Sequence, residues 1–370
     1  MAYPWLYSEY TITYDSTCSI CQYLLRSSLG FICVARQDTK RRMAMKAAWY
    51  TRKGNPKDVL QVGELPDPTP GPGELLVRVR ASGVNPSDTK NRGGPSPMAY
   101  ALVIPHQDGA GEVIGAGSPD LEHRIGQRVW FYEAQLGRPH GSAAEYVVLP
   151  AHQVQPLPDH VKFEEGACLG VPAMTAHRSV FADGSVTDQV VLVTGGAGAV
   201  GRYAIQFAKL GGARVIATVS RDAQARSAKA AGADLVLNRK TDDLVAGIRN
   251  FTGQARGVDR VIDVAFGANL DLVMQVLNPR GVIATYASDE KPEPAIPFWS
   301  LIMLDATIRF VLVYVMDRAA HQAAAEAINT ALEGKQLTHE IAQTYRLDEI
   351  PDMHRAQESG ATIGKLILQV

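Results

Sequence analysis

The sequence has little net charge, few cysteines and no long apolar run. Lys and Arg number 37 against 38 Asp and Glu in 370 residues, so the formal net charge is −1. This balance excludes a strongly basic nucleic-acid-binding protein and leaves only a local basic patch compatible with the composition. No stretch approaches the ~18–20 uninterrupted apolar residues that a membrane-spanning helix needs. We therefore expect neither a nucleic-acid partner nor a membrane span.

The four cysteines are unevenly placed. Cys18, Cys21 and Cys33 lie near the N-terminus, and Cys168 stands alone in the remainder. Such scarcity argues against a disulfide framework and is typical of a reducing compartment, so we expect a cytoplasmic protein. Cys18 and Cys21 form one C-x-x-C pair without a second pair or a His cluster, which is a weak signal for metal or redox chemistry.

Residues 1–44 differ from the rest of the chain. The segment is rich in Tyr, Ser and Cys, and its apolar stretch, 23–35, is followed by the basic run 40–42. A secretory signal has its positive charge before the apolar region, and the acidic residues here argue against an organellar presequence. We expect this N-terminal extension to be disordered, or to lie upstream of a natural start at Met43 or Met45.

From residue 45 to about 165, the pattern predicts many short strands separated by Gly and Pro turns. Residues 75–81 alternate apolar and polar side chains, as a half-buried strand does. Further strands are expected at 45–50, 112–114, 127–130 and 143–149. The first part of the chain is therefore predicted to be a β-rich domain.

From about residue 166, buried-type strands alternate with helical patterns. The continuous apolar run 190–193 is typical of a strand covered on both faces. A helix is predicted at 202–210, and further buried strands are predicted at 214–220, 235–237, 259–264 and 281–286. This alternation predicts an α/β fold with a doubly wound parallel sheet.

The strongest chemical signal is a glycine-rich loop between the first strand and first helix of that region. Gly196, Gly198 and Gly201 fit G-x-G-x-x-G. In this pattern, glycines permit a tight turn, close approach of a pyrophosphate and close packing of helix on strand. The free N–H groups of the helix N-terminus then face the phosphates. The loop therefore predicts dinucleotide binding.

The end of the next strand indicates which dinucleotide is bound. An NAD-binding fold places an acidic residue there to bind the ribose hydroxyls. This chain has Ser220 and Arg221 instead, and Arg239 follows the third strand. Because these side chains suit a 2′-phosphate, we expect NADP(H) rather than NAD(H). A solvated surface position remains the alternative for either arginine.

Four motifs occur in the order of one known family. Gly83–Thr89 resembles the family motif G-V-N-P-x-D-T, and Gly170–Ala176 resembles G-V-P-x-x-T-A. Gly198–Gly201 resembles the phosphate loop, and Gly364–Ile367 resembles a C-terminal G-K strand. Residues 45–370 thus resemble the zinc-independent, zeta-crystallin-like quinone oxidoreductases of the medium-chain dehydrogenase/reductase superfamily.

The resemblance implies a GroES-like catalytic domain from residues 45–165 and 317–370, and a Rossmann NADP(H)-binding domain from residues 166–316. It also implies site residues. The cofactor-binding set, with the loop glycines included, is Asn85, Thr175, Gly196, Ala197, Gly198, Ala199, Val200, Gly201, Ser220, Arg221, Arg239, Asn269, Ser288, Leu312 and Lys365. The catalytic candidates are Asn85, Asp88 and Thr175, with Asn85 polarising an acceptor oxygen and Asp88 orienting it or shaping the turn.

The resemblance also bears on metal. Asn85, Gln107 and Val171 stand where zinc-dependent relatives have ligands, and none of the three is a good zinc ligand. His106 precedes Gln107 at a position that the family usually fills with Gly, so we interpret it as a pocket-lining or structural residue. We expect no metal. Many relatives have Tyr where this chain has Lys90. This lysine could contact the substrate, bind a phosphate of the cofactor or face solvent.

The resulting hypothesis is an NADPH-dependent oxidoreductase that transfers hydride to a quinone or a similar electron-poor acceptor. The first alternative is an NADPH-dependent alkenal, enone or enoyl-thioester reductase on the same fold. A further alternative, from another class, is an NADPH-binding sensor or structural protein with little turnover, since fold alone does not fix function.

One apolar run late in the cofactor domain suggests an assembly. Residues 309–316 are predicted to form a long strand at the edge of the sheet. An open apolar edge invites association, and similar proteins pair this edge across a homodimer. We therefore expect a homodimer, with a strand covered within the monomer as the alternative.

Overall fold

The computed structural model describes residues 44–253 and 257–370. All of them belong to one compact unit. The predictions made for residues 1–43, including the C-x-x-C pair and the choice of start, lie outside the described residues.

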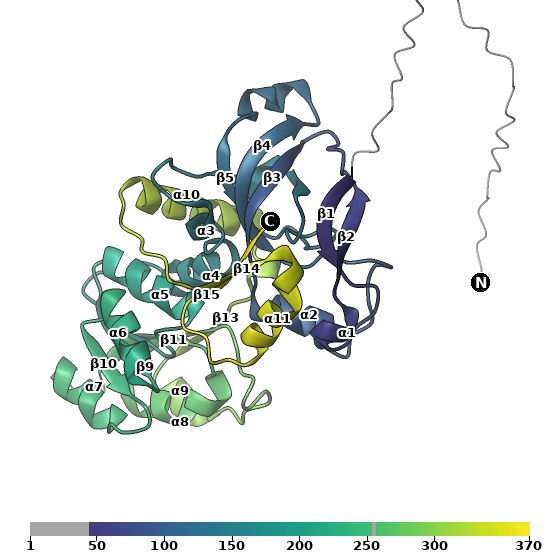
Figure 1. Cartoon of the computed structure of the whole chain (residues 1–370). Coiled ribbons are helices and arrows are strands. Elements are labelled where there is room, and N and C mark those ends of the chain that lie inside the picture. The colour runs from purple at the N-terminus through teal and green to yellow at the C-terminus, as the bar shows by residue number, and fades with distance from the viewer. Residues whose placement is uncertain (1–43, 254–256) are drawn as a thin grey trace, which may run out of the picture. The chain divides into compact units, whose positions relative to one another are not determined.

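A parallel sheet forms the centre of the second half of the chain (Figure 1). Its strands are β8 (Val190–Val193), β9 (Arg214–Val219), β10 (Leu235–Asn238), β11 (Val258–Asp263), β12 (Leu277–Thr285) and β13 (Thr307–Phe310). Their order is β10-β9-β8-β11-β12-β13, and every neighbouring pair is parallel. This is the order of a doubly wound dinucleotide-binding sheet. The predicted fold class is confirmed.

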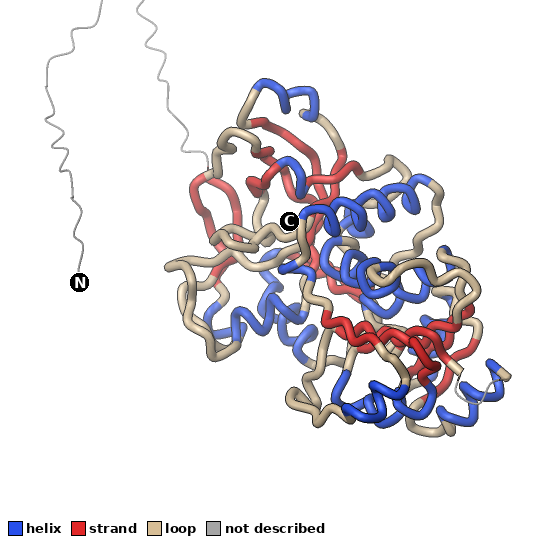
Figure 2. Tube along the Cα trace, turned by 180° about the vertical axis from the view of Figure 1, so that it is seen from behind, coloured by secondary structure: helices blue, strands red, loops and turns tan. Residues whose placement is uncertain are grey.

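Strand β8 shows why its sequence is a continuous apolar run. Val191 and Val193 pack into a cluster with helices on one face, whereas Val190 and Leu192 pack into a second cluster on the other. Figure 2 shows helices on both faces of these strands. The covering helices are α4 (Gly170–Phe181), α5 (Ala199–Leu210), α6 (Asp222–Ala230), α7 (Leu244–Thr252), α8 (Phe266–Val276) and α9 (Phe298–Met303). Both faces of the strand are therefore buried, as the pattern predicts.

A second, largely antiparallel sheet forms the β-rich part. Its strands are β3 (Glu74–Gly83), β4 (Asp108–Ala116), β5 (Arg128–Phe131), β6 (Tyr146–Pro150), β7 (Val154–Pro156), β14 (Ile341–Arg346) and β15 (Lys365–Gln369). They follow the order β14-β15-β3-β4-β5-β7, and β6 also pairs with β3. A separate hairpin consists of β1 (Ala44–Trp49) and β2 (Gln61–Pro66). The remaining helices are α1 (Pro56–Val59), α2 (Pro86–Gly93), α3 (Phe163–Gly166), α10 (Arg318–Glu333) and α11 (Ile350–Glu358).

The end of the chain returns to the sheet built by its beginning. Strand β15 pairs antiparallel with β3, with Ile367 opposite Gly83. In Figure 1 the C-terminus lies beside the β-rich part, close to β3. The return places the last residues of the chain next to the G-V-N-P turn that follows β3. The predicted boundaries near residues 165 and 317 stay a prediction.

The predicted strand at 309–316 is wrong in its extent. β13 ends at Phe310, opposite Thr285, which is the last residue of its partner β12. Once that partner ends, the ladder has no further hydrogen-bonding row, and residues Val313–Val315 turn into a 3₁₀ helix, η3. The β-branched composition of the run misled the prediction because pairing, rather than local propensity, determines strand length.

Candidate active site

The glycine-rich loop joins β8 to α5 as predicted. Gly195 has a φ of +63°, a conformation that glycine adopts without strain. A Cβ at Gly201 would stand only 2.4 Å from the backbone oxygen of Gly195, so helix and loop approach too closely for a side chain. Gly198 precedes α5, whose first turn has no side-chain cap. The loop thus presents a close backbone surface and a helix N-terminus that fit a pyrophosphate.

Three residues of the loop pack against the protein interior: Gly196, Ala197 and Gly201. Ala197 is buried, and a Cβ at Gly196 would press against Ala217 of β9 at 2.8 Å. None of these three residues lines the cleft described below. Their placement makes them structural parts of the turn.

The three residues predicted to bind a 2′-phosphate gather at the carboxyl ends of β9 and β10. The backbone N–H of Arg239 donates to the oxygen of Val219, which brings the start of that loop beside Ser220. The Ser220 hydroxyl donates to Gln224 at 2.9 Å, and Arg221 donates to the backbone oxygen of Ala361 at 2.9 Å. Both arginines are exposed. They are therefore close in the fold and accessible to a ligand.

A cleft of about 540 Å³ runs from the glycine loop to the G-V-N-P turn. Gly195 and Val264, which follow the adjacent strands β8 and β11, both line it. This is the point where the strand order of a doubly wound sheet reverses, and ligands of such sheets bind there. The predicted site residues that line the cleft are Asn85, Thr175, Gly198, Ala199, Val200, Leu312 and Lys365.

A buried polar cluster closes one end of the cleft. The amine of Lys365 donates to Asn85 Oδ1 at 2.6 Å and to Asp108 Oδ2 at 2.9 Å. The amide of Asn85 donates to the same Asp108 oxygen at 2.8 Å, and the backbone N–H of Val171 donates to the other at 2.8 Å. Asp108 is fully buried. We name Asn85, Asp108 and Lys365 the polar triad.

Asp108 was missed by the sequence analysis. It directly follows Gln107 and opens β4, and a single acid at such a place carries no distinctive spacing. The only available signal was an acidic residue at the start of an apolar, glycine-rich strand, where burial demands a partner. In the structure it fixes the side chains of Asn85 and Lys365, so it holds two of the predicted site residues in place.

Asp88 lies behind Asn85 and does not line the cleft. Its carboxylate accepts the backbone N–H of Asn85 at 2.7 Å. Burial, reinforced by the nearby charge of Asp108, raises the pKa of Asp88 to about 7. The geometry is that of a residue orienting the turn, and its direct part in catalysis stays a prediction.

Two predicted cofactor contacts lie elsewhere. The Asn269 amide donates to Asp263 Oδ1 at 2.7 Å, at the junction of β11 and α8. Ser288 accepts the N–H of Gly267 at 3.0 Å and donates to the oxygen of Lys291 at 2.6 Å. Neither residue lines the cleft. Ser288 instead lines a neighbouring pocket.

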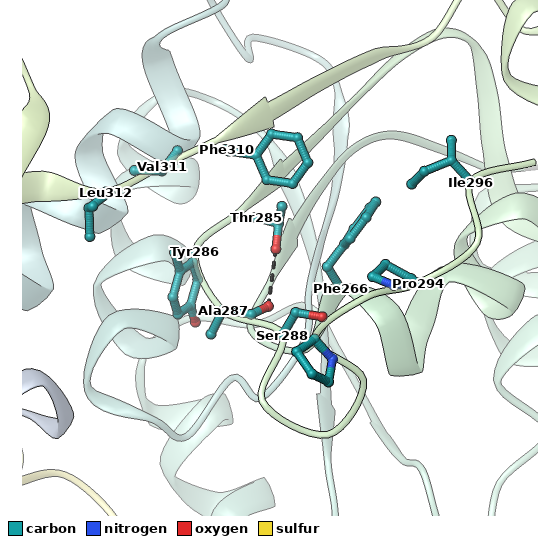
Figure 3. A pocket seen from close by; sticks show the side chains of 11 residues that line it. Phe266, Thr285, Tyr286, Ala287, Ser288, Pro294, Ile296, Phe310, Val311 and Leu312 are labelled. Carbon is teal, nitrogen blue, oxygen red and sulfur yellow. Dashed lines mark hydrogen bonds between the residues drawn. The ribbon is translucent and has the colours of Figure 1, made fainter. Parts of the chain in front are cut away.

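That neighbouring side pocket, of about 500 Å³, opens beside the cleft and shares Tyr286, Ala287, Val311 and Leu312 with it. Figure 3 shows Phe266 and Phe310 beside each other in its wall, where their rings make an edge-to-face contact with centroids 5.7 Å apart. Among the described residues that line it, none carries a charge.

Two of the hydroxyls that line the side pocket, those of Thr285 and Ser288, are bonded within the protein. Thr285 donates to the backbone oxygens of Asp263 and Ala287 at 3.2 and 3.3 Å, and Ser288 is held as described above. Apart from the Tyr286 hydroxyl, the side pocket therefore offers mainly apolar surface to a ligand.

Lys90 reaches across the cleft to the loop that follows β12. Its amine contacts both carboxylate oxygens of Asp289, at 2.7 and 2.8 Å. Both side chains are exposed, and both residues line the cleft. The sequence could not predict this partner, because the two residues are 199 positions apart.

His106 is fully buried and has a φ of +79°. Its Nδ1 contacts the Ser82 hydroxyl at 2.8 Å, and its Nε2 lies 3.0 Å from Nε2 of His354. Burial, followed by the effect of His354, lowers the pKa of His106 well below its usual value, so the ring is neutral. Of the two predicted roles, the structural one matches this placement, since His106 does not line the cleft.

Within the described ranges, no group of three or more His, Cys, Asp or Glu side chains is arranged to hold a metal ion. The three positions where zinc-dependent relatives have ligands carry Asn85, Gln107 and Val171. The Gln107 amide oxygen accepts the backbone N–H of Gln135 at 3.0 Å. The absence of metal from the working protein stays a prediction. None of the helices that the structure describes is long and apolar enough to cross a membrane.

Fold and site together define a class: an oxidoreductase built from a Rossmann sheet and a GroES-like domain. Residues 199–330 match the family model for zinc-binding dehydrogenases, and residues 71–159 match the alcohol dehydrogenase GroES-like domain. The chain belongs to the medium-chain dehydrogenase/reductase superfamily.

Its relatives include quinone oxidoreductases. Those of Pongo abelii and Homo sapiens are 28% and 27% identical over 328 residues, which cover 88% of this chain and 97% of each relative. A mycobacterial protein solved in complex with NADPH is 29% identical, with a TM-score of 0.77 over 88% of this chain and all of that one. A solved NAD-dependent alcohol dehydrogenase is similar to the same extent, at 28% identity and a TM-score of 0.78, over 88% of this chain and all of that one.

Proposed function

We propose that the protein is an NADPH-dependent oxidoreductase that transfers hydride to a quinone or a similar electron-poor acceptor without metal. The observation that carries the proposal is one continuous cleft. It has a pyrophosphate-type glycine loop at one end, the polar triad at the other and an uncharged side pocket beside it. The similarity to quinone oxidoreductases, and to a neighbour solved with NADPH, supports it.

The predicted site residues that line the cleft, and those at the carboxyl ends of β9 and β10, receive parts in this proposal. The backbone of residues 198–200 would bind the pyrophosphate. Ser220, Arg221 and Arg239 would bind the 2′-phosphate, because their side chains offer a hydroxyl and two positive charges. When bound, NADPH supplies a hydride. Leu312 would contact the nicotinamide end of the cleft.

The acceptor would be held at the polar triad. Asn85 is the candidate for polarising its oxygen, and Lys365 and Asp108 hold the Asn85 amide in place. Thr175, on α4, lines the same cleft and would bind the cofactor ribose or the acceptor. The uncharged side pocket favours an apolar acceptor, such as a substituted quinone.

The test follows absorbance at 340 nm while purified protein and NADPH meet a quinone, an enone and a crotonyl thioester in turn. Loss of NADPH with the quinone is expected. Loss with the enone or the thioester but not with the quinone would replace the proposal by a double-bond reductase. NADPH binding without turnover of any acceptor would favour a sensor or structural role. Zinc at one ion per chain in a metal assay would contradict the metal-free part.

Cofactor choice has a separate test. We expect Arg221→Ala to weaken NADPH binding about tenfold while NADH binding changes little, because only NADPH carries the 2′-phosphate. Arg226→Ala, which removes an exposed arginine from the next helix, is the matched control and should change neither. Fluorescence titration measures both affinities. An equal loss for the two cofactors would place Arg221 outside the phosphate site.

We further propose a homodimer formed through the exposed edge strand β13, in the cytoplasm that the cysteine scarcity suggests. Exposed apolar side chains gather on β13, α9 and the segments beside them: Phe298, Trp299, Ile302, Met303, Phe310 and Val315. Exposure of so many large apolar groups on neighbouring elements is typical of an association surface. Sedimentation velocity should show a dimer, and Met303→Glu should yield monomer. A monomeric wild-type chain at micromolar concentration would contradict this.

A further inference from the structure

Two hydroxyl groups meet in the cleft from opposite sides. Ser87, in the first turn of α2, and Tyr314, in the 3₁₀ turn after β13, place Oγ and OH 2.7 Å apart. Both residues line the cleft, as does Asn85 of the polar triad. Each hydroxyl carries one proton, and the bond between them uses one. The pair therefore retains a second proton that it can direct into the cleft.

Tyr314 is held in its neutral form. Burial, reinforced by the charge of Asp88, raises the pKa of the Tyr314 phenol well above 10. A tyrosinate at this place would be poorly solvated. The phenol therefore does not act as a lasting proton source, but it can pass a proton on when another group replaces that proton at once.

A second cavity supplies the other side of Tyr314. This lateral pocket, of about 220 Å³, shares Tyr314 with the cleft. Its other lining residues are Tyr132, Glu133, Leu136, His152, Met316, Arg318 and His321. Tyr314 thus stands between the cleft and a pocket that is rich in titratable groups.

His321 is the proton-bearing group of the lateral pocket. Its Nε2 lies 3.0 Å from Glu133 Oε1. Burial acts to lower the pKa of His321, but the hydrogen bond and charge of Glu133 outweigh it and raise the pKa. By contrast, burial and the charge of Arg318 lower the pKa of His152, and burial raises that of Tyr132 to about 12. His321 is therefore the group there that most readily gives up and regains a proton near neutral pH.

We propose that Ser87 and Tyr314 form a proton relay from the lateral pocket to the acceptor oxygen. The proposal rests on the proposed function and adds the proton source that hydride transfer alone does not provide. Hydride brings the acceptor two electrons and one hydrogen, and a quinone needs one further proton to become a hydroquinone.

The proton step balances without another reactant. As hydride arrives, the O–H bond of Ser87 breaks and its proton bonds to the acceptor oxygen. The proton of Tyr314 passes to the Ser87 oxygen in the same movement. Tyr314 recovers a proton through water in the lateral pocket, from His321 and ultimately from solvent. The net reaction consumes one solvent proton for each acceptor reduced.

The test removes each hydroxyl and varies the acidity of the product. Tyr314→Phe and Ser87→Ala should each lower kcat about 100-fold with a quinone whose hydroquinone is a weak acid. The defect should shrink toward wild type along a series of quinones whose hydroquinones are progressively more acidic, because their oxyanions need no proton during turnover. The double variant should be no worse than either single one, and Ser87→Thr should recover most activity.

Controls separate the relay from folding and from the proposed function. Tyr345→Phe alters a tyrosine on β14 that does not line the cleft and should leave kcat unchanged. NADPH affinity, measured by fluorescence, and calorimetric binding of an unreactive phenol separate cofactor and acceptor binding from turnover. A kcat that is unchanged, or that falls equally for every quinone, overturns the relay and leaves the proposed function intact. A wild-type chain that reduces no acceptor overturns both.

Discussion

The two walls of the cleft are built in opposite ways. On the side of the antiparallel sheet, Asn85, Asp108 and Lys365 are buried and bonded to one another. On the side of the parallel sheet, the wall is largely apolar, and Leu312 is half exposed. We call the first side the polar wall, because its charged side chains are buried away from water. We call the second side the apolar wall, because its apolar side chains are partly exposed to water.

The difference separates stability from recognition. A buried, bonded charge cannot lose its partner without leaving an unsatisfied group in the interior, so changes there should cost folding energy. An exposed apolar side chain contributes little to folding and gains most when a ligand covers it. Substitutions in the polar wall should therefore mainly lower the free energy of unfolding. Substitutions in the apolar wall should mainly change KM for the acceptor.

The largest effect is expected from Asp108→Ala. The substitution leaves the Lys365 ammonium buried without its counter-charge and frees the Asn85 amide, at a cost of about 3–5 kcal/mol of unfolding free energy. Urea unfolding measures it. Glu112→Ala, on the same strand, breaks the exposed pair with Arg80 and should cost under about 1 kcal/mol. A similar loss of unfolding free energy in both variants would contradict the prediction that the buried charge stabilises the fold more than the exposed one.

Asp88 should give the next largest effect, as a dependence on pH. Its pKa is raised in the fold to about 7, so the folded chain binds this proton more tightly than the unfolded chain. The contribution of Asp88 to stability is present below about pH 4 and is lost as the pH rises to about 7. Asp88→Asn mimics the protonated acid and should become more stable relative to wild type by roughly 2–4 kcal/mol across this window. A constant difference from pH 4 to 8 would contradict the shift.

Leu312→Ala tests the apolar wall. Leu312 lines the side pocket as well as the cleft, so it can contact the acceptor beside the nicotinamide. We expect KM for an apolar quinone to rise about tenfold, because the acceptor loses roughly 1–2 kcal/mol of apolar contact. The unfolding free energy should change by less than about 0.5 kcal/mol, as for most exposed positions. Leu210→Ala alters another exposed leucine, at the end of α5, and should leave KM unchanged. A lower unfolding free energy without a change in KM would show that Leu312 contributes to folding rather than to acceptor binding.

The smallest effect is expected where the walls touch. Lys90→Gln removes the exposed ion pair with Asp289, which should contribute less than about 1 kcal/mol and be screened by salt. The free energy of unfolding of the wild type should be slightly lower in high salt than in low salt, and that of the variant should not change. A tenfold change in NADPH affinity would instead show that Lys90 binds the cofactor, as one of the sequence-based interpretations suggests.

The sequence predicted the features that depend on neighbouring residues. The buried strand β8, the glycine loop and the end of α5 follow from local pattern, because one segment contains the whole signal. The start of α5 was predicted at Arg202, one turn later than the observed Ala199. The polar triad did not follow, since Asn85 and Lys365 are 280 positions apart and Asp108 has no motif of its own. The strand at 309–316 was overextended because its length depends on where β12 ends. The resemblance assigned Asn269 and Ser288 to the cofactor; both are bonded within the protein, and their contact with the cofactor stays a prediction.

The return of the chain to its first sheet has a consequence for synthesis. Lys365 lies close to the C-terminus, yet it completes a site begun at Asn85. A ribosome releases the chain from its N-terminus onward, so the early strands can fold while the end is still unmade. Until β15 pairs with β3, Asp108 lacks its ammonium partner. A nascent chain that does not yet include Lys365 would therefore lack the ammonium that bonds Asn85 and Asp108 at the end of the cleft.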